Sequence, residues 1–295
     1  MGQIKNIVLT GASGYLGSNL LKQLIADGYN ISILIRRTSD LTRIKEFISV
    51  VNVYYTEDKP YSNLFEDAGV DLVIHTAASY GRKSESVLEV QEANVTFPLA
   101  LIQEAVKQGV PYFINTDTTL PRMLNSYTLS KKQFTDWLEY FQKQITILNI
   151  EVQYFYGPGD DHSKLITGIA GKLVSDIKSI DFTAAEQKRD FIYIEDVVNA
   201  YMVLIRNLNK SNSFTAVELG SGKAIMLKEI LLQLKQLSGN QSVHMNFGAL
   251  PMRPGDIMFA QADIHYLQQL GWKPAYSLEQ GLSKTLQYEK EQINK

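Results

Sequence analysis

The 295-residue sequence predicts an α/β protein built on a doubly wound parallel sheet, followed by a smaller C-terminal part. Two observations predict this fold class. Over the first half of the chain, short apolar segments of strand length alternate with longer segments of helical period. At the first junction between a strand and a helix, Gly11, Gly14 and Gly17 fall at G-x-x-G-x-x-G spacing.

The glycine triplet predicts a cofactor site as well as a turn. The apolar run Ile4–Leu9 predicts a buried strand, and the leucines that follow Gly17 have helical period. Glycines let the backbone turn sharply and approach a ligand closely, while a helix start offers free N–H groups to a pyrophosphate. The alternative is that the glycines only allow the turn. Their place between a strand and a helix favours the Rossmann type of dinucleotide site.

The second predicted strand, Asn30–Ile35, ends at two arginines, Arg36 and Arg37. In NAD-binding sheets an acidic residue about 20 positions after the glycines binds the ribose 2′-hydroxyl, and this chain has none there. Because guanidinium groups pair well with phosphate, NADP(H) is favoured over NAD(H), although a solvated basic loop would have the same composition. After the third strand, at about 50–55, either Glu57 or Asp58 could meet the adenine amine.

The fourth predicted strand, Val70–Ala78, ends in the small residues Ala77 and Ala78, as needed where a flat cofactor passes close to the backbone. We expect His75, inside this strand, to be a packed core histidine. The next helix, 87–108, contains Pro98, which predicts a kink or a local restart.

The fifth strand, Val110–Asn115, leads into Thr116, Asp117 and Thr118 at the carboxyl end of the sheet, where open parallel sheets place ligands. A helix is then expected from about Asn125. Within it Tyr127 and Lys131 are four residues apart and share one face. Nearby positive charge would lower the pKa of the phenol and make Tyr127 a proton donor to a carbonyl. The alternative is a packing tyrosine with a solvated lysine.

The regular alternation weakens after the sixth strand, 145–156. We therefore assign residues 1–156 to a dinucleotide-binding domain, to which 190–219 return, and 157–295 mostly to a substrate-binding part. Asp160 and Asp161 lack a convergent ligand set, so no metal site is predicted. Phe134, Trp137 and Phe141 indicate either a dimer face or a well-buried helix.

The composition excludes several classes of protein. A formal net charge of -2 argues against a general nucleic-acid or membrane-surface binder. The absence of cysteine excludes disulfides and thiolate chemistry and suits the cytoplasm. No apolar run approaches the ~18 residues of a membrane helix. We expect a soluble cytoplasmic protein.

The ordered motifs of the chain resemble the extended short-chain dehydrogenase/reductase family, the NAD-dependent epimerase/dehydratase group that acts on nucleotide sugars. The resemblance covers nearly the whole length. It rests on Thr10-Gly-Ala-Ser-Gly-Tyr-Leu-Gly17, His75-Thr-Ala-Ala78, Asn94-Val-Thr, Tyr127-x-x-x-Lys131, Tyr156-Gly-Pro-Gly159, Arg189-Asp-Phe-Ile-Tyr-Ile-Glu-Asp196, Arg253-Pro-Gly-Asp256 and Leu270-Gly-Trp-Lys-Pro274.

The resemblance implies roles for individual residues. Tyr127 is the acid/base, Lys131 binds the nicotinamide ribose, and Thr116 fills the third catalytic position. The implied cofactor-binding residues are Gly11, Ser13, Gly14, Tyr15, Leu16, Gly17, Arg36, Arg37, Asp58, Ala77, Ala78, Asn94, Tyr127 and Lys131. The implied substrate-binding residues are Ser79, Thr118, Arg189 and Arg253, the two arginines gripping the diphosphate of a nucleotide sugar.

Departures from the family pattern narrow the implied reaction. Sugar 4,6-dehydratases carry Ser-Thr-Asp-Glu where this chain has Asn115-Thr-Asp-Thr118, so dehydration is disfavoured. Glu151 stands where 4-epimerases often have arginine. The chain looks most like the NADPH-dependent 4-keto-deoxysugar reductases of the CDP-paratose and CDP-abequose synthase type, which serve deoxysugar and O-antigen biosynthesis. An NAD-dependent nucleotide-sugar epimerase and a non-enzymatic NADP-binding sensor are the alternatives. A homodimer is expected.

Overall fold

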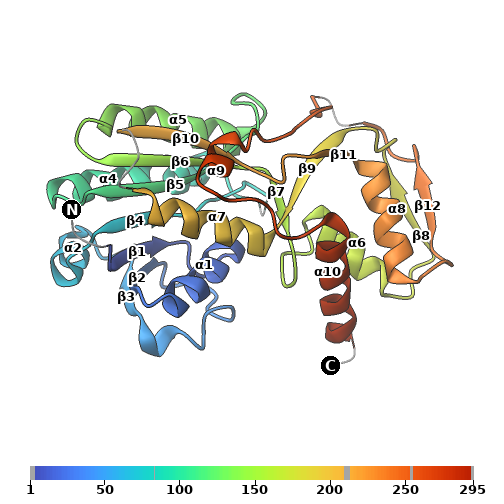
Figure 1. Ribbon diagram of the computed structural model, residues 1–295, viewed down its shortest axis with the longest axis horizontal. Coiled ribbons are helices and arrows are strands. Elements are labelled where there is room, and N and C mark those ends of the chain that lie inside the picture. The colour runs from blue at the N-terminus through green and yellow to red at the C-terminus, as the bar shows by residue number, and fades with distance from the viewer. Residues whose placement is uncertain (1–3, 83, 209–212, 253–254, 294–295) are drawn as a thin grey trace. The chain divides into compact units, whose positions relative to one another are not determined.

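The computed structural model (Figure 1) describes residues 4–82, 84–208, 213–252 and 255–293. It contains a seven-stranded sheet in the order β10-β6-β5-β4-β1-β2-β3. The pairings from β3 to β6 are parallel. The strands are β1 (Asn6–Thr10), β2 (Asn30–Ile35), β3 (Asn52–Tyr55), β4 (Leu72–His75), β5 (Tyr112–Thr118), β6 (Thr146–Val152) and β10 (Phe214–Leu219). The predicted α/β fold class is confirmed.

The strand order reverses between β1 and β4, since the chain builds outward from β1 to β3 and then crosses to the other side. Ligands of open parallel sheets bind outside the carboxyl ends of the strands at such a switch point. The glycine turn after β1 and Ala77 after β4 lie at this point, so the topology places the predicted cofactor residues together.

Helices cover both faces of this sheet. On one face α2 (Ser62–Ala68), α4 (Phe97–Lys107) and α5 (Ser126–Phe141) enclose a single apolar core with the inward side chains of the strands. On the other face lie α1 (Tyr15–Ala26) and α7 (Ile194–Arg206), where the Arg206 guanidinium pairs with Asp27 at 2.6 Å.

Pro98 restarts a helix, as predicted. The segment contains α3 (Val87–Gln91), a π-helical turn η2 (Glu92–Thr96) and α4, in which Pro98 is the second residue. A proline in the first turn lacks only an N–H that the helix would leave unpaired.

The strand β5 is longer than predicted, and this changes the site. It does not end at Asn115 but continues to Thr118, with Thr116, Asp117 and Thr118 in register with residues 150–152 of β6. Because neighbouring side chains of a strand point to opposite faces, Thr116 and Asp117 are directed to different sides of the sheet.

Contacts divide the chain into two units, residues 1–152 with 198–218, and residues 153–197 with 219–295. The second unit contains a three-stranded sheet, β11-β9-β7, and a two-stranded sheet, β12-β8. Its elements are β7 (Tyr154–Tyr156), α6 (Leu165–Leu173), β8 (Ser179–Phe182), β9 (Lys188–Tyr193), β11 (Ala224–Met226), α8 (Leu227–Ser238), β12 (His244–Phe247), α9 (His265–Gln269) and α10 (Leu278–Ile293). Among the described residues, no helix has the length and apolar character needed to span a bilayer.

Candidate active site

The turn after β1 leaves no room for side chains. Gly11 has φ 72°, and a Cβ there would come within 2.6 Å of the Ala77 amide nitrogen. A Cβ at Gly17 would collide with the Gly11 carbonyl oxygen. Gly14 caps α1 without a side-chain hydrogen bond and is exposed. The glycines therefore leave the backbone at the start of α1 uncovered by side chains of their own, which fits the close approach of a pyrophosphate.

The neighbouring cofactor candidates differ in burial. Ser13, Tyr15 and Ala77 are partly buried, Leu16 is buried in the core, and Ala78 is exposed. Arg43 lies over the Tyr15 ring, with its guanidinium carbon 5.9 Å from the ring centroid. The residues that follow β4 next to the glycine turn, Ala77 and Ala78, thus have small side chains.

Asn94 joins the end of β4 to α5. Its amide oxygen accepts from the Ser79 amide at 2.7 Å, and its amide nitrogen donates to the Ser79 carbonyl at 2.8 Å and to the Ser130 hydroxyl at 2.9 Å. Asn94 is fully buried. It therefore fixes the backbone of Ser79 beside the residue that precedes Lys131.

Arg37 is held by its own neighbours. One terminal nitrogen lies 2.7 Å from each carboxylate oxygen of Asp58, and the guanidinium stacks over the Tyr55 ring at 4.2 Å. Arg36 and Arg37 are both exposed. Asp58, predicted as an adenine contact, is here the ion-pair partner of Arg37.

The start of α5 places Tyr127 and Lys131. The Asn125 side chain accepts from the Thr128 amide at 2.9 Å, and the Thr128 hydroxyl accepts from the Asn125 amide in return, which forms a capping box. Tyr127 therefore sits in the first turn, partly buried, and Lys131 follows one turn later with 1% of its surface exposed. The predicted helix start is confirmed.

Burial controls the ionisation of both groups. It raises the pKa of Tyr127 well above its usual value, assisted by Tyr80 and Asp117 and opposed by the Arg82 charge and a hydrogen bond with Thr118. The lowered pKa that we expected for Tyr127 is therefore not found, because burial of the phenol outweighs nearby positive charge. Burial lowers the pKa of Lys131 to about 8, with Asp117 acting in the opposite direction. A neutral phenol is the form that a proton donor needs.

Two threonines of β5 have different partners. The Thr116 hydroxyl lies 2.7 Å from the Tyr201 hydroxyl of α7. Thr118 is buried, and it acts against the raised pKa of the Tyr127 phenol. The extended β5 thus brings Thr118 to the phenol and directs Thr116 toward α7.

Sequence reasoning missed two groups beside Tyr127. The Tyr80 ring lies 4.8 Å from the Tyr127 ring with an angle of 36° between the planes, and the Arg82 guanidinium is 5.5 Å from the Tyr80 centroid. Both residues follow β4 at the carboxyl edge of the sheet. Ligands of open parallel sheets bind at the carboxyl ends of the strands, and this rule could have indicated Tyr80 and Arg82 after β4 as it indicated Thr116 after β5.

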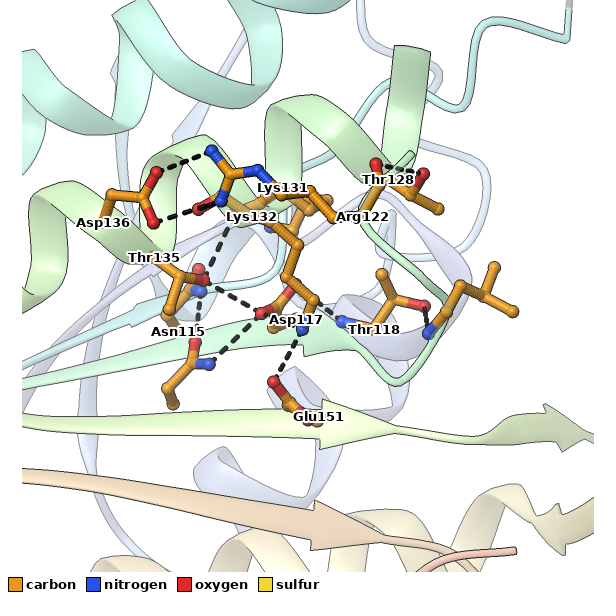
Figure 2. A network of polar contacts seen from close by, with 12 residues as sticks. Asn115, Asp117, Thr118, Arg122, Thr128, Lys131, Lys132, Thr135, Asp136 and Glu151 are labelled. Carbon is orange, nitrogen blue, oxygen red and sulfur yellow. Dashed lines mark hydrogen bonds and ion pairs between the residues drawn. The ribbon is translucent and has the colours of Figure 1, made fainter. Parts of the chain in front are cut away.

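A polar network lies next to Lys131, in the layer between β5, β6 and α5 (Figure 2). The Asp117 carboxylate accepts from the Lys132 ammonium at 2.9 Å, and Lys132 also contacts Glu151 at 2.6 Å. Asn149 and Thr135 donate to the same carboxylate. The Asp117 side chain has no exposed surface.

His75 is a core residue, as predicted. It is fully buried, its Nδ1 lies 2.7 Å from the Thr10 hydroxyl, and the rings of Phe97, Phe113 and Phe134 surround it. Burial, together with the Lys131 charge, lowers its pKa well below the usual value. His75 is therefore uncharged near neutral pH.

In the second unit, Arg189 is buried and ion-paired. It has 5% of its surface exposed, donates to Asp256 at 2.8 Å and lies over the Tyr154 ring at 5.7 Å. Arg253, the other predicted diphosphate ligand, lies outside the described residues. Within the described part of the chain, no group of acidic residues and histidines is arranged to hold a metal ion.

Comparison with known proteins identifies relatives of the chain. The model of the NAD dependent epimerase/dehydratase family matches residues 7–220. CDP-abequose synthase of Salmonella muenchen is 32% identical over 291 residues, which cover 96% of this chain and 97% of that protein. CDP-abequose synthase of Salmonella typhimurium is 30% identical over 294 residues, covering 95% and 97%.

The fold also matches a solved structure. The crystal structure of UDP-glucose 4-epimerase from Thermotoga maritima with UDP-glucose superposes with a TM-score of 0.85 at 21% identity, covering 98% of this chain and 99% of that chain. At this identity the similarity concerns the fold alone.

Proposed function

The chain belongs to the NAD dependent epimerase/dehydratase family, whose members act on nucleotide sugars, and we propose that it is an NADPH-dependent reductase. Its substrate is a nucleotide-activated deoxysugar of the CDP-4-keto-3,6-dideoxyhexose type, used in deoxysugar and O-antigen biosynthesis. Two relatives named CDP-abequose synthase, similar over nearly the whole chain, support this substrate class. The observation that supports the reaction is the capped start of α5, which places Tyr127 one helical turn before the buried Lys131. Burial raises the pKa of Tyr127, which favours the neutral phenol.

The reaction requires one hydride and one proton. NADPH, when bound, supplies the hydride that reaches C4 of the sugar. Tyr127 donates its hydroxyl proton to the oxygen at C4, so that the ketone becomes an alcohol. Lys131 stabilises the phenolate that this leaves and binds the nicotinamide ribose. Either Thr116 or Thr118 hydrogen-bonds the oxygen; Thr116 is the position implied by the family, and Thr118 contacts Tyr127.

The arginines after β2 support NADP(H) over NAD(H). Arg36 and Arg37 are exposed at the end of the second strand, where the 2′-phosphate is expected, and the Tyr55 ring and Asp58 orient Arg37. The Gly11, Gly14 and Gly17 turn would bind the pyrophosphate. Calorimetric titration of the protein with NADP and with NAD tests this preference by comparing the two dissociation constants.

Substrate binding and assembly complete the proposal. Ser79, Thr118, Arg189 and Arg253 are assigned to the nucleotide sugar. Of the apolar side chains of α5, Phe134 and Phe141 are buried, whereas Trp137 and Tyr140 are 41% and 66% exposed and contact each other. This exposed pair supports a homodimer, which sedimentation of the purified protein tests. A cytoplasmic location is part of the proposal, and cell fractionation tests it.

Substitution of the phenol tests the reaction. Tyr127→Phe removes the proton donor and should reduce turnover of a CDP-4-keto-3,6-dideoxyhexose about 10²- to 10⁴-fold while NADP binding is retained. Tyr266→Phe, which changes a partly buried tyrosine of α9 that has no role in the proposal, is the control and should leave turnover unchanged. Near-normal turnover in Tyr127→Phe would exclude the assignment. Thr116→Val and Thr118→Val compare the two hydroxyls in the same assay.

The two alternatives give different results in this assay. An epimerase would interconvert two nucleotide sugars without consuming added NADPH. A sensor would bind NADP saturably and turn over none of a panel of 4-keto sugar nucleotides.

A further inference from the structure

The Asp117 carboxylate is the most completely enclosed charge beside the catalytic lysine. Four donors reach it, as Figure 2 shows for the side chains. The Thr118 amide donates to one oxygen at 2.7 Å, and the other oxygen accepts from Lys132 at 2.9 Å, Thr135 at 2.9 Å and Asn149 at 3.2 Å. All four partners donate to the carboxylate, and this arrangement favours its ionised form.

This arrangement excludes Asp117 from direct proton transfer to a substrate. Its side chain has no exposed surface, and burial would by itself raise its pKa, but the charges of Lys131 and Lys132 and the hydrogen bonds lower it. Asp117 is thus a fixed anion.

The charges around Lys131 balance. Lys131 and Lys132 contribute two positive charges, and Asp117 and Glu151 contribute two negative ones. Among the described residues, the other titratable groups near this region are His75 from β4, which is uncharged, and the phenol of Tyr127, on which Tyr80 and Arg82 act. Arg122, which donates to the Lys132 carbonyl, and its partner Asp136 form an exposed ion pair on the outer side of α5. The Lys131 ammonium is therefore held charged in a buried site chiefly by Asp117, while Lys132 repels it and Glu151 offsets Lys132.

Contacts also tie Asp117 to the backbone of the catalytic residues. Thr135 lies 2.9 Å from Asp117 through its hydroxyl, which is also 3.2 Å from the Lys131 carbonyl. The Thr118 amide binds the carboxylate directly, and the Thr118 side chain contacts Tyr127. One carboxylate is thus linked to both the lysine turn of α5 and the threonine beside the phenol.

We propose that Asp117 is a positioning residue that supplies the counter-charge for Lys131 and fixes Thr118 against Tyr127, with Lys132 and Glu151 setting the strength of that counter-charge. The inference rests on the proposed function, because it assumes that a charged Lys131 is needed for the reaction. It assigns no contact between Asp117 and the substrate.

Titration of Lys131 in two variants tests the proposal. In protein labelled with ¹³Cε-lysine, with the Lys131 signal assigned from Lys131→Met, the wild-type midpoint is expected at about 8. Asp117→Asn should lower the midpoint by about 1 unit, because an attracting charge is lost. Lys132→Gln should raise it by about half a unit, because a repelling charge is lost. The alkaline limb of the plot of kcat/KM against pH should move to lower pH in Asp117→Asn and to higher pH in Lys132→Gln.

A purely structural role predicts a different result. Disruption of packing would move both midpoints in the same direction or leave them unchanged, and either result overturns the proposal. If Asp117→Asn fails to fold, Glu151→Gln replaces it, since Glu151 is 24% exposed in its side chain and its loss should lower the midpoint by a smaller amount.

The titration is independent of turnover. Opposite shifts in a protein that reduces no 4-keto sugar would support the inference and reject the proposed reaction. Unchanged midpoints in an active reductase would reject the inference alone.

Discussion

Two buried aspartates, one in each unit, show how different donors give the same side chain different consequences. Asp117 in β5 and Asp190 in β9 are 3% and 0% exposed, and each accepts four hydrogen bonds. Asp190 receives only neutral donors, from the amide and hydroxyl of Ser221 and the amides of Gly222 and Ala262. Asp117 receives a lysine ammonium.

A buried carboxylate with all its hydrogen-bond partners can therefore either join segments of the chain or act through its charge on a neighbouring ionisable group. Around Asp190 the donors come from chain segments far apart in sequence, so the carboxylate joins β9 to the turn after β10 and to the segment near residue 262. A Cβ at Gly220 would come within 2.5 Å of its oxygen, which shows how closely the backbone surrounds it. Asp117 accepts the same number of hydrogen bonds, but in our proposal its negative charge also stabilises the charged form of Lys131.

Removal of the Asp190 charge should give the largest loss of stability. Asp190→Asn places an amide NH₂ against backbone donors, and we expect the free energy of unfolding to fall by about 4 kcal/mol. Urea denaturation measures this. Ser221→Ala removes one hydroxyl donor and should cost about 1 kcal/mol. A loss below 1 kcal/mol in Asp190→Asn, or a shifted Lys131 midpoint, would remove the contrast with Asp117.

Lys131→Met should stabilise the folded protein by about 3 kcal/mol at pH 7. The pKa of this buried lysine is about 8 in the folded protein against 10.5 for the free side chain. Below pH 8 the ammonium is therefore charged while it is buried away from water, which lowers the free energy of unfolding. The unfolded chain binds more protons between pH 8 and 10.5, and wild-type stability should therefore rise relative to the variant over this range. Denaturation of both proteins at pH 7, 8 and 10 measures the difference, and a less stable variant at pH 7 would contradict the account.

A smaller effect is expected in acid. Because the pKa of Asp117 is lowered in the folded protein, its contribution to stability is present above the unfolded value near 3.8 and is lost as pH falls through the folded value. The stability difference between wild type and Asp117→Asn should therefore shrink below about pH 4. A difference that stays constant from pH 7 to pH 3 would show that the pKa of Asp117 is the same in the folded and unfolded protein, which would contradict the account.

Local features of the site could be predicted from the sequence. The glycine turn and the capped start of α5 depend on residues a few positions apart, and the ordered motifs identified the family, which the comparisons confirm. Regular alternation predicted the fold class because most strands of the first unit, namely β1, β2, β4, β5 and β6, are buried in a helix-covered sheet.

Features that depend on register could not be predicted. Asp117 meets Glu151 only because β5 extends three residues beyond Asn115 alongside β6, and the same extension sends Thr116 to Tyr201. Arg37 and Asp58 are joined across adjacent strands, 21 residues apart in the chain. The raised pKa of Tyr127 follows from burial, which the positions of two residues on one helix do not reveal.

The most direct measurement of the central claim is the stoichiometry of the reaction. Purified protein incubated with NADPH and a CDP-4-keto-3,6-dideoxyhexose should consume one NADPH for each sugar converted to the 4-hydroxy product, as followed by absorbance and product NMR. Conversion of one nucleotide sugar into another with no NADPH consumed would contradict the account.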